Sequence, residues 1–251
     1  HSFSRRQRQM CIRDRYFNRQ LELLGVAVQL NTDVQAGELL AYDEVVLATG
    51  VKPRAWNLPG AGEDARVVSY IDVLKGDAEL GDTIAIIGAG GIGFDVAEFL
   101  VHDGRHDFYE TWGIDKEFGE RGGLNVPADV TSERTVHMLQ RSAKKMGGGL
   151  GKTTGWIHRM GLKKAGVQMH TGVAYQSLSP DGLRYTQDGE EHTLAADHFV
   201  VCAGQEPFHP LADDLKVMGK PALLIGGALN ASKLDAQRAI KEGLELAYAL
   251  R

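Results

Sequence analysis

The stretch DTIAIIGAGGIGFDVAEFLVHDG at residues 82–104 decides the fold. Its apolar first part predicts a buried strand, and an amphipathic helical pattern follows the glycines. Between the two lies a G-x-G-x-x-G motif formed by Gly88, Gly90 and Gly93, with Gly91 inside it. A strand, a glycine turn and a helix in this order are typical of a dinucleotide-binding site.

Each glycine of this motif has a physical task. Gly88 permits the tight turn, Gly90 lets the backbone approach a pyrophosphate, and Gly93 lets the helix pack closely on the strand. The first N–H groups of the helix then offer hydrogen bonds to the phosphates. We therefore predict that Gly88, Gly90, Gly91 and Gly93 bind a dinucleotide. The alternative is a glycine turn that holds no ligand.

The choice between NADP(H) and NAD(H) depends on the end of the next predicted strand, at residues 135–141. An NAD site usually carries an acid there, which binds the ribose 2′-OH. This chain instead has QRSAKK at residues 140–145, with three cations and no acid. Because a 2′-phosphate carries about two negative charges, Arg141 and Lys144 favour NADP(H). A solvated basic turn is the alternative.

Predicted strands alternate with predicted helices along the rest of the chain. This alternation predicts an α/β fold with a central parallel sheet and helices on its faces. A polar insertion at residues 102–133 is expected to hold at most a helical turn or two. The expected strands lie at residues 26–30, 38–42, 43–50, 83–87, 135–141, 167–173, 197–204 and 222–227, with a hairpin turn at Asp188-Gly189. The expected helices lie at residues 16–24 and 68–76, after the first glycine motif, after the glycine loop that opens residues 146–166, and at residues 233–250.

Three further apolar runs end in glycine, at residues 45–50, 200–204 and 222–227. Such an end lets a ligand or a crossing chain approach the backbone closely. Each run alone reads as an ordinary buried strand with a turn, but together with the first motif they form a pattern. The candidate cofactor-binding residues from these runs are Thr49, Gly50, Gly204, Gly226 and Gly227.

Several segments add a more specific signal. They are AIIGAGGIGFDVAEFL, WGID (112–115), MLQR (138–141), GLGKTTGWIHR (149–159), VVCAGQEP (200–207), IGG (225–227) and LDAQRAI (234–240). Together they resemble the C-terminal FAD- and NADPH-binding part of the bacterial NADPH-dependent 2,4-dienoyl-CoA reductases, which are flavoproteins with two dinucleotide-binding domains. The resemblance runs from about residue 16 to the end. GLGKTTGWIHR is its most specific element. Gly151-Lys152-Thr153 is not a P-loop, because Met146 stands where that motif needs a glycine, but we expect the glycine-rich loop and Lys152 to lie near a cofactor phosphate or the nicotinamide half of the cofactor.

The resemblance implies a domain organisation. A Rossmann-like NADP(H)-binding domain at residues 81–207 would be inserted in a partial FAD-binding α/β domain at residues 16–80 and 208–251. Electrons would pass from NADPH to FAD, then through a [4Fe–4S] cluster and FMN to an unsaturated fatty acyl-CoA of β-oxidation. The cluster, the FMN and the acyl-CoA site are expected only in an N-terminal part that this sequence lacks, since its two cysteines cannot ligate such a cluster.

We therefore expect this chain to bind NADP(H), and FAD through a partial site, as the electron-input portion of a longer reductase. It is expected to contain no catalytic residue for the dienoyl-CoA reduction and not to perform that reaction alone. Two alternatives stay open: a related flavin oxidoreductase of the enoate reductase type, and a catalytically inactive nucleotide-binding fragment.

Composition excludes other classes of protein. The net charge of −5 and the pI of about 6.0 argue against a nucleic-acid partner, and no apolar run reaches the roughly 18 residues of a membrane span. Scattered histidines predict no metal site. Free cysteines and the lack of a secretory signal favour the cytoplasm. Residues 1–15, rich in arginine, are expected to be a disordered or non-native leader rather than a targeting or nucleic-acid arm.

Overall fold

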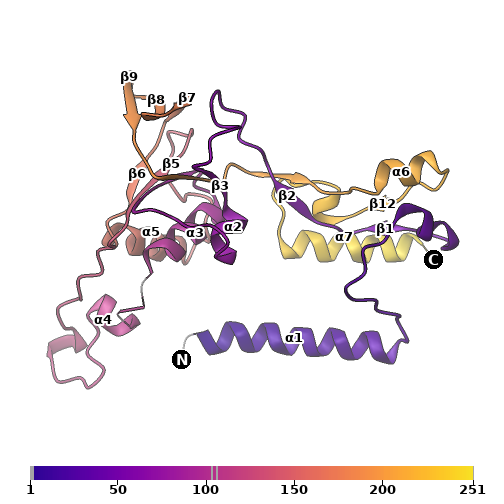
Figure 1. Cartoon of the computed structure of the whole chain (residues 1–251). Coiled ribbons are helices and arrows are strands. Elements are labelled where there is room, and N and C mark those ends of the chain that lie inside the picture. The colour runs from indigo at the N-terminus through magenta and orange to yellow at the C-terminus, as the bar shows by residue number, and fades with distance from the viewer. Residues whose placement is uncertain (1–2, 103, 106, 251) are drawn as a thin grey trace. The chain divides into compact units, whose positions relative to one another are not determined.

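The computed structural model describes residues 3–102, 104–105 and 107–250, with side chains from Ile12 onward (Figure 1). The chain divides into two compact units. The first unit comprises His1–Leu47 and Pro210–Leu223, and the second comprises Ala48–His209 and Leu224–Arg251. None of the helices within the described ranges is both long and apolar enough to cross a membrane.

A five-stranded sheet forms the centre of the second unit. All its strands are parallel, and they follow the order β3-β10-β4-β5-β6. The bounds are β3 (Val67–Ser69), β10 (His198–Val201), β4 (Thr83–Ile87), β5 (Thr135–Leu139) and β6 (Gln168–His170). The predicted central parallel sheet is thus confirmed. The sheet also includes β3, which precedes residue 81 in the chain, although the sequence places the start of the NADP(H)-binding domain at that residue.

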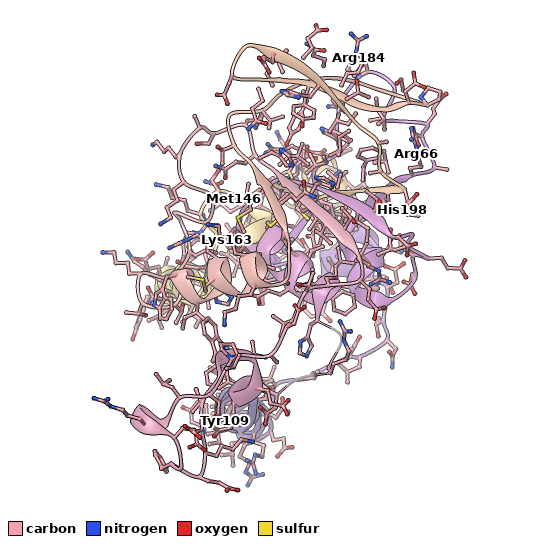
Figure 2. All side chains as sticks on the ribbon, turned by 90° about the vertical axis from the view of Figure 1, so that its left-hand side faces the viewer. Arg66, Tyr109, Met146, Lys163, Arg184 and His198 are labelled. Carbon is pink, nitrogen blue, oxygen red and sulfur yellow. The ribbon has the colours of Figure 1, made fainter. Side chains whose placement is uncertain are left out.

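The two faces of this sheet are covered differently. Helices α2 (Tyr70–Lys75), α3 (Gly91–Val101) and α5 (Gly155–Lys164) pack on one face. A three-stranded antiparallel sheet covers the other: β7 (Ala174–Ser179), β8 (Gly182–Gln187) and β9 (Glu190–Leu194). Figure 2 shows Lys163 on the helical side and Arg184 on the three-stranded sheet. The expectation of helices on both faces is therefore wrong for one face, since a predicted hairpin does not reveal what it will pack against.

Strand β4 shows why this sheet is stable. Its side chains alternate between faces, as they do in any strand. Ile84 and Ile86 join the core beneath the helices, whereas Ala85 and Ile87 join the core beneath β7–β9, and all four are fully buried. Burial of each isoleucine contributes about 1.5–3 kcal/mol. The apolar run that predicted this strand is apolar throughout because both of its faces are covered.

Two short segments run between the central sheet and the C-terminal elements. Strand β2 (Val51–Pro53) pairs antiparallel with β11 (Gln205–Pro207). The turn η3 (Gly226–Ala228) and helix α7 (Ala236–Ala249) follow later in the chain.

Within the described part of the polar insertion the structure has α4 (Phe108–Trp112) and η2 (Arg121–Gly123), which agrees with the expected helical turn or two.

The first unit contains α1 (Phe3–Leu23), η1 (Ala36–Ala41), β1 (Val46–Leu47) and α6 (Ala212–Val217), and the chain leaves it within β12 (Leu223–Leu224). Helix α1 ends just before Gly25, as expected, but it also takes in residues 3–15, where the sequence suggests disorder. Residues 1–2 of that leader lie outside the described residues. The expected strand at 38–42 is wrong, because this segment falls largely in the 3-10 helix η1.

The expected strand at residues 26–30 is also wrong. Val26, Val28 and Leu30 are 48%, 57% and 78% exposed, and no strand pairs with them among the described residues. A strand is stabilised by hydrogen bonds from a neighbouring strand. The alternating pattern of this segment is real, but the pattern does not supply the partner.

Candidate nucleotide-binding sites

The glycine motif between β4 and α3 has the conformation that its sequence requires. Gly88 has φ of +108°, and a Cβ atom there would lie 2.5 Å from the carbonyl oxygen of Cys202. A Cβ atom on Gly93 would lie 2.2 Å from the carbonyl oxygen of Gly88. Side chains at these two positions would therefore push the backbone apart. Gly90 is different, because no atom lies within 4 Å of its Cβ position.

A cavity of about 430 Å³ opens at the N-terminus of α3. This volume lies within the range of small-molecule sites. Backbone forms much of its wall, because five of its eleven lining residues are glycines. The lining residues are Ala89, Gly90, Gly91, Gln140, Ser142, Lys144, Lys145, Gly147, Gly148, Gly149 and Leu150.

The charges around this cavity suit an anion. Lys144 and Lys145 line it, and no carboxylate does. The N-terminus of α3 adds the positive end of a helix dipole and N–H groups that have no partner within the helix. The amide nitrogen of Gln140 donates to the carbonyl oxygens of Ser142 (2.8 Å) and Lys144 (2.5 Å), which folds the basic turn over the cavity edge.

Two cations expected at the cofactor are not among the residues that line the cavity. Arg141 is exposed, and its charge acts on Tyr175, whose hydroxyl donates to the carbonyl oxygen of Leu139 at 3.1 Å. Burial raises the pKa of Tyr175, and the charge of Arg141 opposes that rise. Lys152 is exposed in a turn before α5. The candidate residues from the sequence omit Ser142 and Lys145, although both belong to the basic turn that favoured NADP(H). The glycine loop 147–149, which the sequence places near the cofactor, does line this cavity.

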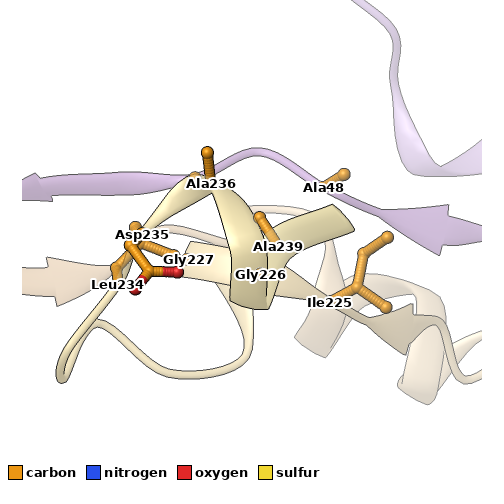
Figure 3. A pocket seen from close by; sticks show the side chains of 9 residues that line it. Ala48, Ile225, Gly226, Gly227, Leu234, Asp235, Ala236 and Ala239 are labelled. Carbon is orange, nitrogen blue, oxygen red and sulfur yellow. The ribbon is translucent and has the colours of Figure 1, made fainter. Parts of the chain in front are cut away.

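A second cavity, also of about 430 Å³, lies at the N-terminus of α7 (Figure 3). It brings together three of the candidate glycines, Gly50, Gly226 and Gly227. Asp235 is its one charged lining residue, and its side chain caps α7 by accepting the N–H of Arg238 at 2.8 Å. The remaining lining residues are Ala48, Ile225, Leu234, Ala236 and Ala239.

The glycines of this second cavity have different surroundings. A Cβ atom on Gly227 would lie 2.8 Å from Cγ1 of Val51, so this glycine is needed for the close approach of another chain segment. The N–H of Gly226 donates to Oε2 of Glu242 at 2.6 Å. Gly50, with φ of +79°, has open space around its Cβ position. Of the three glycines, Gly50 thus leaves space open beside its backbone, whereas Gly226 and Gly227 are engaged by Glu242 and Val51.

Two candidate flavin residues lie outside this cavity. The hydroxyl of Thr49 donates to the carbonyl oxygen of Phe208, and the N–H of Phe208 donates to the carbonyl oxygen of Gly50 at 3.0 Å. Gly204 has φ of +108° and lies 3.6 Å, at its Cβ position, from Nη1 of Arg54. In the structure both residues lie where the β2 and β11 segments contact each other, rather than at the α7 cavity.

The described side chains show no cluster of three or more histidine, cysteine, aspartate or glutamate residues that could hold a metal ion. Cys202 is buried at the end of β10, and burial raises the pKa of its thiol to about 12. It therefore stays a protonated thiol at neutral pH and acts as a small core residue. The side chain of Cys11 lies outside the described residues.

A parallel α/β sheet with a glycine turn and an anion-suited cavity at a helix N-terminus is typical of the class of nucleotide-binding proteins. The model of the pyridine nucleotide-disulphide oxidoreductase family matches residues 18–222. The chain belongs to this family. The family implies FAD and a pyridine nucleotide as cofactors, and the residues around the α3 cavity fit the nucleotide. The α7 cavity fits one part of FAD, since it offers a helix N-terminus and an apolar wall.

The individual relatives share about a quarter of their aligned residues with this chain, and they are much longer. A metal reductase of Desulforamulus reducens is 24% identical over 84% of this chain and 32% of its own length. A cinnamate reductase of Clostridium sporogenes is 25% identical over 83% of the chain and 27% of its own length. A solved structure of a 2-naphthoyl-CoA reductase is 25% identical, with a TM-score of 0.70 over 92% of this chain and 31% of that one. The chain thus spans about a third of the length of these relatives.

Proposed function

We propose that this chain is the electron-input portion of an NADPH-dependent flavoenzyme that reduces unsaturated acyl-CoA thioesters, of the 2,4-dienoyl-CoA reductase type. One observation carries this proposal: the cavity at the α3 N-terminus is lined by glycine backbone and by Lys144 and Lys145, without a carboxylate. Such a lining favours a phosphate on the ribose over a free 2′-hydroxyl.

In this proposal the pyrophosphate of NADPH lies against Gly90 and Gly91, where the backbone is open and the helix dipole is favourable. Ser142, Lys144 and Lys145 lie within reach of the 2′-phosphate at the edge of the same cavity. Arg141, which the sequence favoured for this task, stays a prediction to be tested beside them. The chain's part in the reaction is to bind and orient the hydride donor.

FAD is proposed to bind partly at the α7 cavity. The first N–H groups of α7 and the backbone of Gly50 would face it, and Ile225 and Ala239 supply apolar wall. The flavin supplies the acceptor for the hydride of NADPH. The domain boundaries at residues 81 and 207, the role of Lys152 and the cytoplasmic location stay predictions.

The acyl-CoA substrate belongs in this proposal to the longer parent enzyme. Two relatives support it by their names, since one is a cinnamate reductase and the other a 2-naphthoyl-CoA reductase, both acting on conjugated acids or their thioesters. The same names favour an enoate reductase as the second candidate, because cinnamate carries no CoA.

The test is an equilibrium titration of the purified chain with NADPH and with NADH at one fixed salt concentration. We expect NADPH to bind at least about tenfold more tightly, which corresponds to about 1.4 kcal/mol. A second titration with FAD, followed by its visible absorption band, measures the α7 cavity. Equal affinities for NADPH and NADH would contradict the proposed 2′-phosphate site.

A further inference from the structure

The segment GLGKTTGWIHR at residues 149–159 is not explained by direct contact with a nucleotide. Its start belongs to the glycine loop 147–150 that lines the α3 cavity, but α5 begins at Gly155 and its residues do not line that cavity. Trp156 is 54% exposed. The helical half of this segment, which lies on α5, instead contacts the glycine loop.

Helix α5 holds the loop from one side. Nη1 of Arg159 donates to the carbonyl oxygen of Gly147 at 3.1 Å. One turn earlier on the same helix, a Cβ atom on Gly155 would lie 2.8 Å from Cβ of Leu150, so only glycine lets the helix approach the loop this closely. The spacing of Gly155 and Arg159 thus places two contacts on the two ends of one loop.

Helix α3 also approaches this loop closely. Gly147 has φ of +69°, and its Cβ position lies 2.7 Å from Cζ of Phe94. One turn along α3 from this ring, Oε1 of Glu98 is joined to Nδ1 of His158 on α5. The two helices that flank the glycine loop are therefore tied together by the residue next to Arg159.

We infer that Arg159 and His158 are positioning residues, which fix the glycine loop 147–150 against α3 so that the nucleotide cavity is formed before its ligand arrives. Three consecutive glycines make a loop of high conformational entropy. Ordering such a loop in advance removes that entropy cost from binding. The identity of the ligand rests on the proposed function, whereas the ordering of the loop does not.

The experiment uses the full chain and three arginine variants. Arg159→Ala removes the bond to Gly147, and Arg159→Lys keeps a donor at that place. Arg134→Ala is the matched control, because Nη1 of Arg134 also donates to a backbone carbonyl, that of Leu100 near the other end of α3, at 3.5 Å. Amide hydrogen exchange of residues 147–151 is measured in the free protein, and the dissociation constant for NADPH is measured by titration.

We expect Arg159→Ala to exchange faster in the loop and to bind NADPH about tenfold more weakly. Arg159→Lys should recover most of both losses, and Arg134→Ala should show neither. Unchanged loop exchange in Arg159→Ala would overturn the inference. Where Arg159→Ala does not fold, His158→Gln replaces it: faster loop exchange supports the inference, and unchanged exchange overturns it.

The two proposals fail in different ways. If the unaltered chain binds neither NADPH nor NADH, the proposed function fails, and the exchange data still decide whether Arg159 orders the loop. If the unaltered chain binds NADPH and Arg159→Ala binds it equally well, with the same loop exchange, the positioning role fails alone.

Discussion

His137 and His170 face each other across β5 and β6, with Nδ1 of the first 3.2 Å from Nε2 of the second. One ring must donate and the other accept, so at least one of the two is neutral. Burial lowers the pKa of both histidines, and their mutual charge repulsion lowers that of His137 further. Tyr185 and His192 continue this row of rings on the three-stranded sheet. The row of rings that reaches from the central sheet to the three-stranded sheet therefore contains at least one uncharged imidazole.

This pair predicts a loss of stability in mild acid. A histidine whose pKa is lowered in the folded state binds protons preferentially in the unfolded state. The free energy of unfolding should thus be highest above about pH 6.5 and fall as the pH falls below it. Urea unfolding at a series of pH values measures this. The double variant His137→Gln, His170→Gln should flatten the dependence, and an unchanged slope in that variant would contradict the prediction.

Two glycines of one motif predict opposite outcomes. Gly90→Val should fold normally, because nothing lies within 4 Å of the new Cβ atom, but it should lose NADPH and NADH together by filling the space of the pyrophosphate. Gly93→Ala should be destabilised by about 1–3 kcal/mol, because its Cβ atom meets the carbonyl of Gly88. Thermal melting and nucleotide titration of both variants separate the two effects. Normal NADPH affinity in Gly90→Val would remove the assignment of the cavity.

The basic turn gives a test of cofactor preference. Lys144 lines the α3 cavity and Arg141 does not. Lys144→Ala should weaken the binding of NADPH by about tenfold, as the loss of a charged hydrogen bond does, and should change the binding of NADH little. Arg141→Ala should have the smaller effect on NADPH. The reverse order would restore Arg141 to the role that the sequence favoured.

An ion pair near the hairpin predicts a second stability effect. Arg66 binds Asp64 through Nε (3.0 Å) and Nη2 (2.7 Å), and also donates to the carbonyl oxygen of Ser179 at 2.6 Å. The hydrogen bond from Arg66 lowers the pKa of Asp64. The ionised Asp64 therefore adds to the free energy of unfolding above about pH 4, and this contribution is lost as the pH falls through the lowered pKa. Asp64→Asn should lower the free energy of unfolding at neutral pH by about 1–2 kcal/mol.

The control for this last prediction is the exposed pair between Arg184 and Glu191, at 3.6 Å. Because both side chains are more than half exposed, Glu191→Gln should change the stability by less than about 0.5 kcal/mol. Equal effects of the two substitutions would mean that the Asp64 pair acts only as a surface contact.

The sequence predicted the elements whose signals are local. The strand at Thr83–Ile87, the turn at Gly88 and the short helices of the polar insertion follow from apolar runs, glycines and polar composition. The hairpin turn at Asp188-Gly189 is equally local, and Asp188 has the positive φ that such a turn requires. Membership in the pyridine nucleotide-disulphide oxidoreductase family also follows from the sequence, whereas the narrower resemblance to the 2,4-dienoyl-CoA reductases stays a prediction.

The sequence by itself thus determined the central parallel sheet, the nucleotide motif and the pyridine nucleotide-disulphide oxidoreductase family, because each depends on residue types and their spacing along the chain. Only the tertiary structure decided which residues meet. It placed Lys145 and the glycine loop, rather than Arg141, around the α3 cavity, and it covered one face of the sheet with strands. It also left residues 26–30 without a partner strand among the described residues. The reason is physical: pairing, packing and convergence of side chains depend on distances between segments far apart in sequence, which no local pattern records.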